Sequence, residues 1–128
     1  MVAWNDYKAI ARERGALAFE VFVAESTPAG DPDAVKAALP DHLAYIQGLE
    51  SDGHLVMAGP MSDDSGTEMQ GAGMVILRAS SMDDARSLAD NDPMHKSGAR
   101  TYRLRKWLVN EGSVSLTVGL STGRIQLS

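Results

Sequence analysis

The order of strand-like and helix-like segments is the feature that most restricts the fold of this 128-residue chain. Two amphipathic stretches predict helices. The first begins at Asp33 and ends at Gly53, and the second begins with a capping box formed by Ser81 and Asp84. Short apolar stretches between and around them predict four strands, at residues 16–24, 54–58, 74–79 and 101–109. The order β-α-β-β-α-β is the split βαβ pattern, so we expect an α+β fold with both helices on one face of an antiparallel sheet.

Two prolines limit the predicted helices. Pro40 falls inside the first helix, where its missing N–H and the clash of its ring with the preceding turn predict a kink or a restart. The second helix must end before Pro93, because the residue before a proline is disfavoured in helical geometry.

Segments outside this pattern are expected at both ends of the chain. Trp4 begins a run of helical spacing that Gly15 ends. Near the other end, two alternating apolar stretches on either side of Ser121 to Gly123 predict a terminal hairpin. We therefore expect one domain over residues 1–128, with an N-terminal helix, a core and a terminal hairpin at residues 1–15, 16–110 and 111–128.

Composition excludes several classes of function. The chain has no cysteine, which rules out thiolate catalysis, disulfides and cysteine-based metal sites, and its three histidines are scattered, so we predict no metal. A net charge of −5 without a basic face argues against a nucleic-acid partner. The first fifteen residues carry charges and no apolar run, which predicts a cytoplasmic protein that has no signal peptide and does not enter a membrane.

The second and third predicted strands are apolar on both faces, although two helices can cover only one face of the sheet. Something else must cover the other face. We favour the sheet of a second subunit, which predicts a homodimer. The N-terminal helix or the terminal hairpin could cover the same face within one chain.

His42 is the most informative polar residue. At about 100° per helical residue, Ile46 and Leu49 point within about 40° of it, so the imidazole faces inward. Partial removal from water near a helix start favours the neutral ring, which accepts a proton near neutral pH as a general base does. The alternative is a histidine at the edge of the core whose ring bonds a backbone carbonyl.

Asp92 is misplaced in a similar way on the second helix. Continuing the helical period sets it within about 60° of Ala85, Leu88 and Ala89, on the apolar stripe. At a helix C-terminus its charge would also need a donor such as an imidazole N–H. The alternative is an Asp-Pro turn in which the carboxylate bonds the local backbone.

Other polar residues have ordinary explanations beside functional ones. Tyr45 lies one turn from His42 and is either a pocket wall and hydrogen-bond donor or a packing residue. His54 is expected at a solvated strand edge, and His95 with Lys96 in a loop that meets water or lines a pocket mouth. Basic residues around the fourth strand favour a solvated or inter-subunit face over an anion site; they are Arg100, Arg103, Arg105 and Lys106.

The stretch from Asp41 to Gly112 resembles the YCII-related family. The motifs that carry the resemblance are His42-Leu43-Ala44-Tyr45-Ile46, Gly53, Ala58-Gly59-Pro60, Gly73, Asp92-Pro93 and Gly98. The resemblance implies a ferredoxin-like fold that pairs into a dimeric α/β barrel, with a His-Asp pair in a cleft. One branch of the family resembles dehydrochlorinases of chlorinated hydroxyquinols, which act without metal or organic cofactor, so we expect no cofactor here.

Two positions depart from the family pattern. Leu39 stands where the family often has arginine, and Met94 stands where an aromatic residue often follows Asp-Pro. These departures concern the substrate contacts, for which Tyr45 and Met94 are the expected residues.

The expected function is that of a cofactor-independent lyase or isomerase acting on a small molecule. His42 would move the proton as general base or acid, and Asp92 would orient the imidazole. The alternative is a non-catalytic small-ligand-binding or assembly module, because this architecture also serves sensor domains. A third reading, a cofactorless monooxygenase on the same fold, has no residue that marks an oxygen site.

Overall fold

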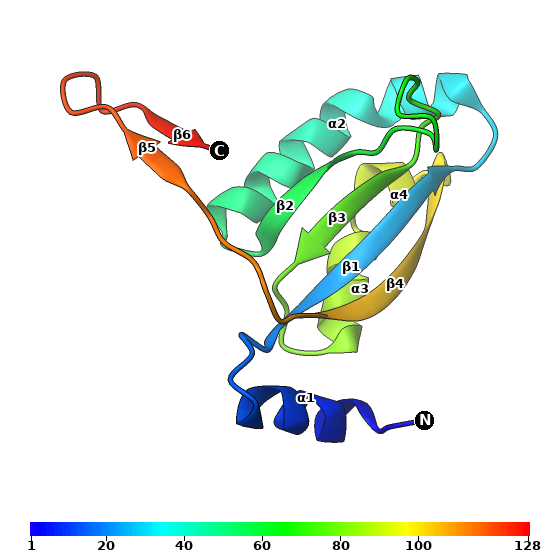
Figure 1. The fold of residues 1–128 in the computed structure, drawn as a ribbon. Helices are drawn as coiled ribbons and strands as arrows, with labels where there is room; N and C mark the ends of the chain where they lie inside the picture. The colour runs from blue at the N-terminus through cyan, green and yellow to red at the C-terminus, as the bar shows by residue number, and fades with distance from the viewer. The chain divides into compact units, whose positions relative to one another are not determined.

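The computed structural model describes all residues, 1–128. Its helices are α1 Trp4–Glu13, α2 Pro32–Ser51, α3 Met82–Asp90 and α4 Pro93–Lys96 (Figure 1). Its strands are β1 Phe19–Pro28, β2 Leu55–Pro60, β3 Gly73–Leu77, β4 Arg100–Val109, β5 Leu116–Val118 and β6 Ile125–Leu127. The fold is therefore mixed α+β, as the sequence predicts, with the short helix α4 as an addition.

The chain divides into two compact units. One consists of Glu20–Trp107 and contains a four-stranded sheet in the order β2-β3-β1-β4. The other combines Met1–Phe19 with Leu108–Ser128 and contains α1 and the two-stranded sheet of β5 and β6. None of the helices is both long and apolar enough to span a bilayer.

In the larger unit, the core lies between one face of the sheet and the helices α2 and α3 (Figure 1). Antiparallel pairing sets Phe22 of β1 opposite Leu77 of β3, which in turn lies opposite Leu55 of β2. Leu49 from α2 and Ala85 from α3 pack in the same cluster. Burial of these side chains fixes the register, because a slip by one residue would turn the whole row to the other face.

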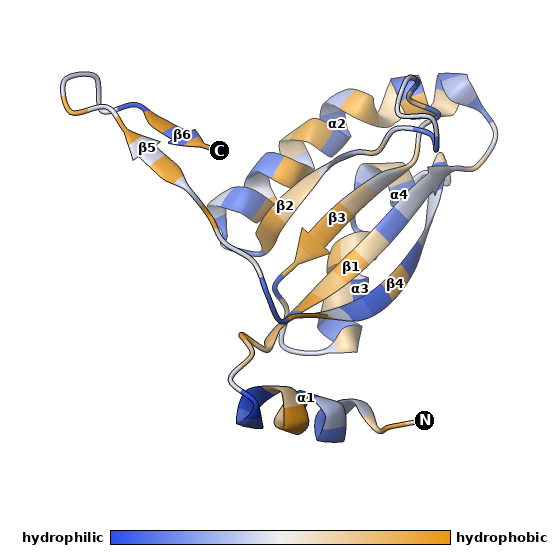
Figure 2. Cartoon of the chain, viewed as in Figure 1, coloured by the Kyte–Doolittle hydropathy of each residue, from blue (hydrophilic) through white to orange (hydrophobic).

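The opposite face of the sheet is also apolar over β1, β3 and β2. Here the paired row is Val23, Ile76 and Met57; the first two are buried and the third is 55% exposed. In Figure 2, β3 is coloured apolar, whereas β4, on the far side of β1, is mostly polar. The predicted two-faced apolar character of these strands is confirmed.

The smaller unit contains the predicted terminal hairpin. Strands β5 and β6 pair antiparallel, with Leu116 opposite Leu127 and Val118 opposite Ile125, and all four side chains are exposed. At the start of the chain, α1 ends before Gly15, whose positive φ of 84° is the left-handed conformation that stops a helix.

Helix α2 differs from its prediction at its start and at its proline. It begins at Pro32, not Asp33, because Asp31 caps it by accepting a hydrogen bond from the Asp33 N–H at 2.9 Å. It then passes Pro40 as one helix of 20 residues instead of restarting. The lost hydrogen bond is tolerated because Leu49, later in the same helix, is buried in the core.

The ends of β1 and α3 also correct the sequence analysis. Strand β1 begins at Phe19 and continues to Pro28, four residues past the predicted end at Ala24. Helix α3 is capped as predicted, with the Asp84 N–H donating to Ser81 Oγ at 3.1 Å, but it ends at Asp90. Asp92 therefore lies outside α3.

Candidate functional site

The structure brings His42 and Asp92 together. Nδ1 of His42, on α2, lies 2.8 Å from Oδ1 and 2.9 Å from Oδ2 of Asp92. Asp92 is 3% exposed, whereas the His42 side chain is 23% exposed. The buried Asp92 carboxylate thus bonds the Nδ1 edge of the His42 ring, and the ring is partly exposed at the surface. The predicted juxtaposition is confirmed, and the catalytic role of the pair stays a prediction.

Asp92 occupies the start of a helix and not, as predicted, the end of one. Asn91 closes α3, and Asp92 then caps α4, whose first residue is Pro93. The carboxylate accepts a hydrogen bond from the Met94 N–H at 2.9 Å. The two interpretations of Asp92 are therefore both correct, since the same carboxylate bonds the local backbone and the imidazole.

This geometry selects one form of the His42 ring. An ionised carboxylate can only accept hydrogen bonds, so Nδ1 must carry the hydrogen that lies between the two groups. In the neutral ring Nε2 is then the bare nitrogen that can accept a proton. When it does, the adjacent carboxylate stabilises the positive charge that forms. The arrangement can therefore work as a general base and then as an acid.

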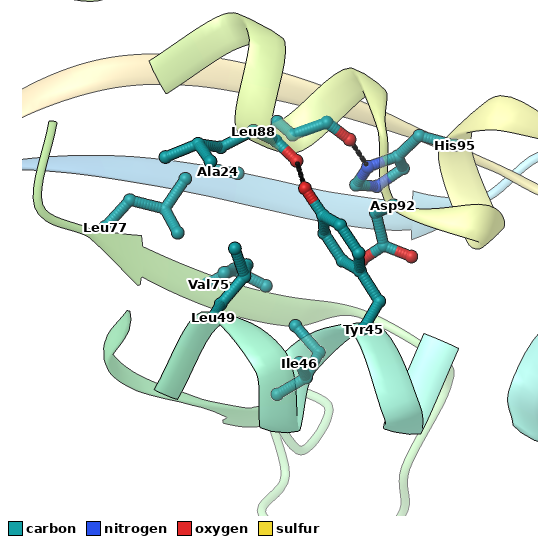
Figure 3. A pocket seen from close by; sticks show the side chains of 10 residues that line it. Ala24, Tyr45, Ile46, Leu49, Val75, Leu77, Leu88, Asp92 and His95 are labelled. Atoms are coloured by element: carbon teal, nitrogen blue, oxygen red, sulfur yellow. Dashed lines mark hydrogen bonds between the residues drawn. The ribbon is translucent and has the colours of Figure 1, made fainter. Parts of the chain in front are cut away.

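Tyr45 lies one turn along α2 from His42, as predicted. Its hydroxyl donates a hydrogen bond to the carbonyl of Leu88 at 2.6 Å (Figure 3). Burial raises the pKa of the Tyr45 phenol, and the negative charge of Asp92 raises it further. The phenol therefore stays protonated well above neutral pH and fastens α2 to α3 next to the pair.

Replacing Tyr45 with phenylalanine should lower the free energy of unfolding at neutral pH by about 1 kcal/mol, the usual net value of one hydrogen bond. Because the folded pKa is raised, the Tyr45 contribution is present below the unfolded value of about 10 and is lost as pH rises through the folded value. Urea unfolding from neutral pH to about pH 11 should show the difference from wild type shrinking. A constant difference, or an equal effect of Tyr7→Phe at an exposed tyrosine, would contradict this.

A small cavity lies on the inner side of the pair. Its volume is about 10 Å³, and Figure 3 shows its lining. The lining residues are Ala24, Tyr45, Ile46, Leu49, Val75, Leu77, Leu88, Ala89, Asp92 and His95. A space of this size holds about one water molecule and no organic ligand. His42 is not part of the lining, so an organic ligand could reach the ring only from its exposed side.

The two predicted departures from the family pattern lie in different surroundings. Met94 is buried, and its backbone N–H holds Asp92. Leu39 is exposed on α2, three residues before His42. Met94 is not among the residues that line the cavity, and its contact with a substrate stays a prediction.

His95 has contacts that the sequence pattern does not predict. It lies in α4 and not in a loop, with Nδ1 2.8 Å from the Ala89 carbonyl and Nε2 2.9 Å from Ser26 Oγ. Arg100 donates from Nε to the same Ser26 oxygen at 2.8 Å. One signal was available: Ser26 continues the core-facing alternation of Phe22 and Ala24, if β1 is extended past its predicted end.

The other polar candidates remain at the surface. His54 is exposed, as predicted. Arg105 forms an ion pair with Glu25 on the sheet face away from the helices, and both side chains are substantially exposed. Arg100 is the one basic residue of β4 that bonds Ser26, the residue that also contacts His95.

Comparisons with known proteins agree with this architecture. The model of the family described as YCII-related domain matches residues 18–108. The uncharacterized protein YjpA of Bacillus subtilis (strain 168) is 27% identical over 66 residues, which cover 52% of this chain and 71% of that protein. A solved structure with TM-score 0.52 and 22% identity covers 68% of this chain and 92% of its own. It is 5-chloro-2-hydroxyhydroquinone dehydrochlorinase (TftG) from Burkholderia phenoliruptrix AC1100 in complex with 2,5-dihydroxybenzoquinone. This likeness shows a shared fold.

Proposed function

This chain belongs to the YCII-related domain family, and we propose that it is a cofactor-independent enzyme of the lyase or isomerase type that acts on a small molecule. One observation carries the proposal: the buried Asp92 carboxylate meets Nδ1 of His42 with both oxygens, at 2.8 and 2.9 Å. A surface histidine that served only solubility would not require a buried charge behind it.

The proposed reaction starts with proton removal. Nε2 of His42 takes a proton from a carbon or hydroxyl group of the substrate, and the electron pair left behind moves into the substrate. In a lyase the electron pair expels a leaving group as an anion, and in an isomerase it moves to another position, which the imidazolium then protonates. Asp92 keeps Nδ1 protonated throughout and stabilises the cation between the two steps.

The substrate would bind at the exposed side of the His42 ring, because the inner cavity is too small for it. The dehydrochlorinase of similar fold was solved with 2,5-dihydroxybenzoquinone, which supports a hydroxylated six-membered ring as the first class to test. Acidic hydroxyl groups on such a ring would supply the proton that Nε2 accepts.

A direct test combines binding with turnover. The wild-type protein and His42→Ala are each incubated with 2,5-dihydroxybenzoquinone and with chlorinated hydroxyquinols, and melting temperature and product formation are followed. We expect a ligand-dependent rise in melting temperature for wild type and product formation that depends on His42. Turnover that is equal in the two proteins would contradict the proposal.

The second candidate is a non-catalytic small-ligand-binding or assembly module, and a cavity too small for an organic ligand favours the assembly form. In that case His42 and Asp92 serve only to join α2 to α4. A ligand that raises the melting temperature and is recovered unchanged, together with strong destabilisation of His42→Ala, would favour the module over the enzyme.

We further propose that two copies of the chain pair through the apolar sheet face away from the helices, as in a ferredoxin-like dimeric α/β barrel. Support comes from Met57, which is exposed in the same row as the buried Val23 and Ile76. Trp107 of β4 is also exposed, and strand alternation from Leu104 in the core sets it on this face. An apolar sheet face of this kind is normally covered by another layer.

Replacing Met57 with glutamate should convert the dimer to monomer, because a charge would be buried between the two sheets. Leu43→Glu is the matched control, since Leu43 is exposed to almost the same degree, 53% against 55%, but lies on α2. Sedimentation analysis should give a monomer for the first variant and a dimer for wild type and control. A monomeric wild type, or equal dissociation of both variants, would contradict the pairing.

A further inference from the structure

A second polar cluster lies beside the His42–Asp92 pair. It consists of Ser26 at the end of β1, His95 on α4 and Arg100 at the start of β4. Ser26 is buried, and the other two are half-buried. Arg100 also donates to the carbonyls of Ser26, at 2.8 Å, and Gly71. The cluster therefore joins two strands, the loop before β3 and the short helix that carries Asp92.

The direction of each hydrogen bond in the cluster follows from its partners. The Ala89 carbonyl only accepts, so Nδ1 of His95 carries a hydrogen. The Arg100 Nε–H only donates, so Ser26 Oγ accepts from it; in the neutral His95 ring with its hydrogen on Nδ1, Nε2 accepts the hydrogen of Ser26 Oγ. The neutral His95 ring is thereby satisfied at both nitrogens. Both ring nitrogens are thus engaged in contacts within the fold, so we assign the ring a positioning role.

What the ring holds is helix α4. A helix of four residues has no stability of its own, so its orientation depends on its ties to the surroundings. His95 ties it to β1 through Ser26 and to the last turn of α3 through Ala89. Asp92 is the cap of this helix, three residues before His95. A rotation of α4 would therefore move the carboxylate away from His42.

The charge of Arg100 acts on the same carboxylate. Burial lowers the pKa of the Arg100 guanidinium, and the negative charge of Asp92 opposes that shift. The attraction is mutual, so it links the half-buried guanidinium of Arg100 to the carboxylate that bonds His42. An ionised Asp92 is the form that accepts the Nδ1 hydrogen of His42.

We propose that Ser26, His95 and Arg100 form a positioning network that holds the Asp92 carboxylate against Nδ1 of His42. The geometric part of this inference is independent of any reaction, whereas its effect on turnover rests on the proposed function. Ser26 is the informative residue to change, because its hydroxyl links the other two.

The test is ¹⁵N NMR of the histidine rings in the full chain, which distinguishes hydrogen on Nδ1 from hydrogen on Nε2 without a substrate. We expect wild-type His42 to carry its hydrogen on Nδ1. In Ser26→Ala the ratio of the Nδ1–H to the Nε2–H form should fall about fivefold, the equivalent of about one hydrogen bond. Ser26→Thr keeps the hydroxyl and should restore the wild-type ratio.

Ser87→Ala is the matched control, an exposed serine on α3 with no side-chain hydrogen bond among those of the structure. If Ser26→Ala does not fold, His95→Gln replaces it, because glutamine keeps a polar atom near Ser26 but loses the bond to Ala89. A His42 ring that is unchanged in folded Ser26→Ala, or changed equally in Ser87→Ala, would overturn the network. A shifted ring in Ser26→Ala alongside an active His42→Ala would instead retain the network and reject the proposed function.

Discussion

Replacing His42 with alanine is expected to lower kcat/KM on a compound that the wild-type protein turns over by about 10²- to 10⁴-fold, the usual contribution of a positioned acid or base. The fold should survive, because the His42 side chain is partly exposed and the Asp92 carboxylate keeps its hydrogen bond from the Met94 N–H. The measurement is steady-state turnover together with thermal unfolding of the same samples.

The matched control is His54→Ala, since His54 is exposed and lies away from the pair. It should leave both turnover and melting temperature at wild-type values. Added imidazole should restore part of the activity of His42→Ala, because the vacated space opens to the surface. Full activity of the folded His42→Ala protein would remove the basis for proton transfer by this ring.

The second large effect is expected for Asp92→Asn, which should lower turnover by up to about 10⁴-fold, the cost of the same change in Ser-His-Asp triads. Asparagine caps helices as well as aspartate does, so its single oxygen can keep the bond from the Met94 N–H. Its NH₂ group then faces Nδ1 of His42, and the ring must carry its hydrogen on Nε2 instead. The atom that should accept the substrate proton is then already protonated.

The variant Asp92→Ala distinguishes the helix-capping role of Asp92 from its role in orienting the His42 ring. It removes the Met94 bond as well, so the free energy of unfolding should fall by about 2 kcal/mol more than in Asp92→Asn. Urea unfolding and turnover of the two variants, measured side by side, check this division. Equal stability of the two variants would contradict the capping role, and wild-type turnover of Asp92→Asn would contradict the orienting role.

The inward direction of His42 could be predicted because it depends only on the angular spacing of nearby residues around one helix. Ile46 and Leu49 follow Pro40, so the angle between them and His42 is the same whether the helix restarts or continues at the proline. The sequence could not decide between these two outcomes, since burial of Leu49 against the sheet is a tertiary contact.

Asp92 was predicted correctly as a partner for an imidazole, but from a wrong premise. The helical period places Asp92 on the apolar stripe only if α3 continues past Asn91, and the helix has already ended there. A new helix, α4, instead begins at Pro93. The negative charge of Asp92 therefore lies at the start of a helix, where it is favourable, and not at a helix end, where it would be repelled. A proline at a first helical position was the available sign of this start.

Ser26 and His95 show what the sequence could not supply. Ser26 begins a run of turn-forming residues, and its place in β1 is set by pairing with Gly73 of β3, 47 positions along the chain (73 − 26). Tertiary pairing thus outweighs local turn preference. His95 meets Ser26 only because that strand is extended. The size of the cavity behind Asp92 also depends on packing that no local pattern reports.

Pro40 has a final consequence for how the protein could change over evolution. A proline inside a helix leaves the carbonyl four residues earlier, that of Lys36, without its usual partner. The series of backbone hydrogen bonds in α2 is thus interrupted at Pro40, two residues before His42. The part of the helix that follows is anchored by Tyr45 and Leu49. Substitutions or length changes in the preceding turns can therefore alter that part of α2 while the alignment of the imidazole is inherited unchanged.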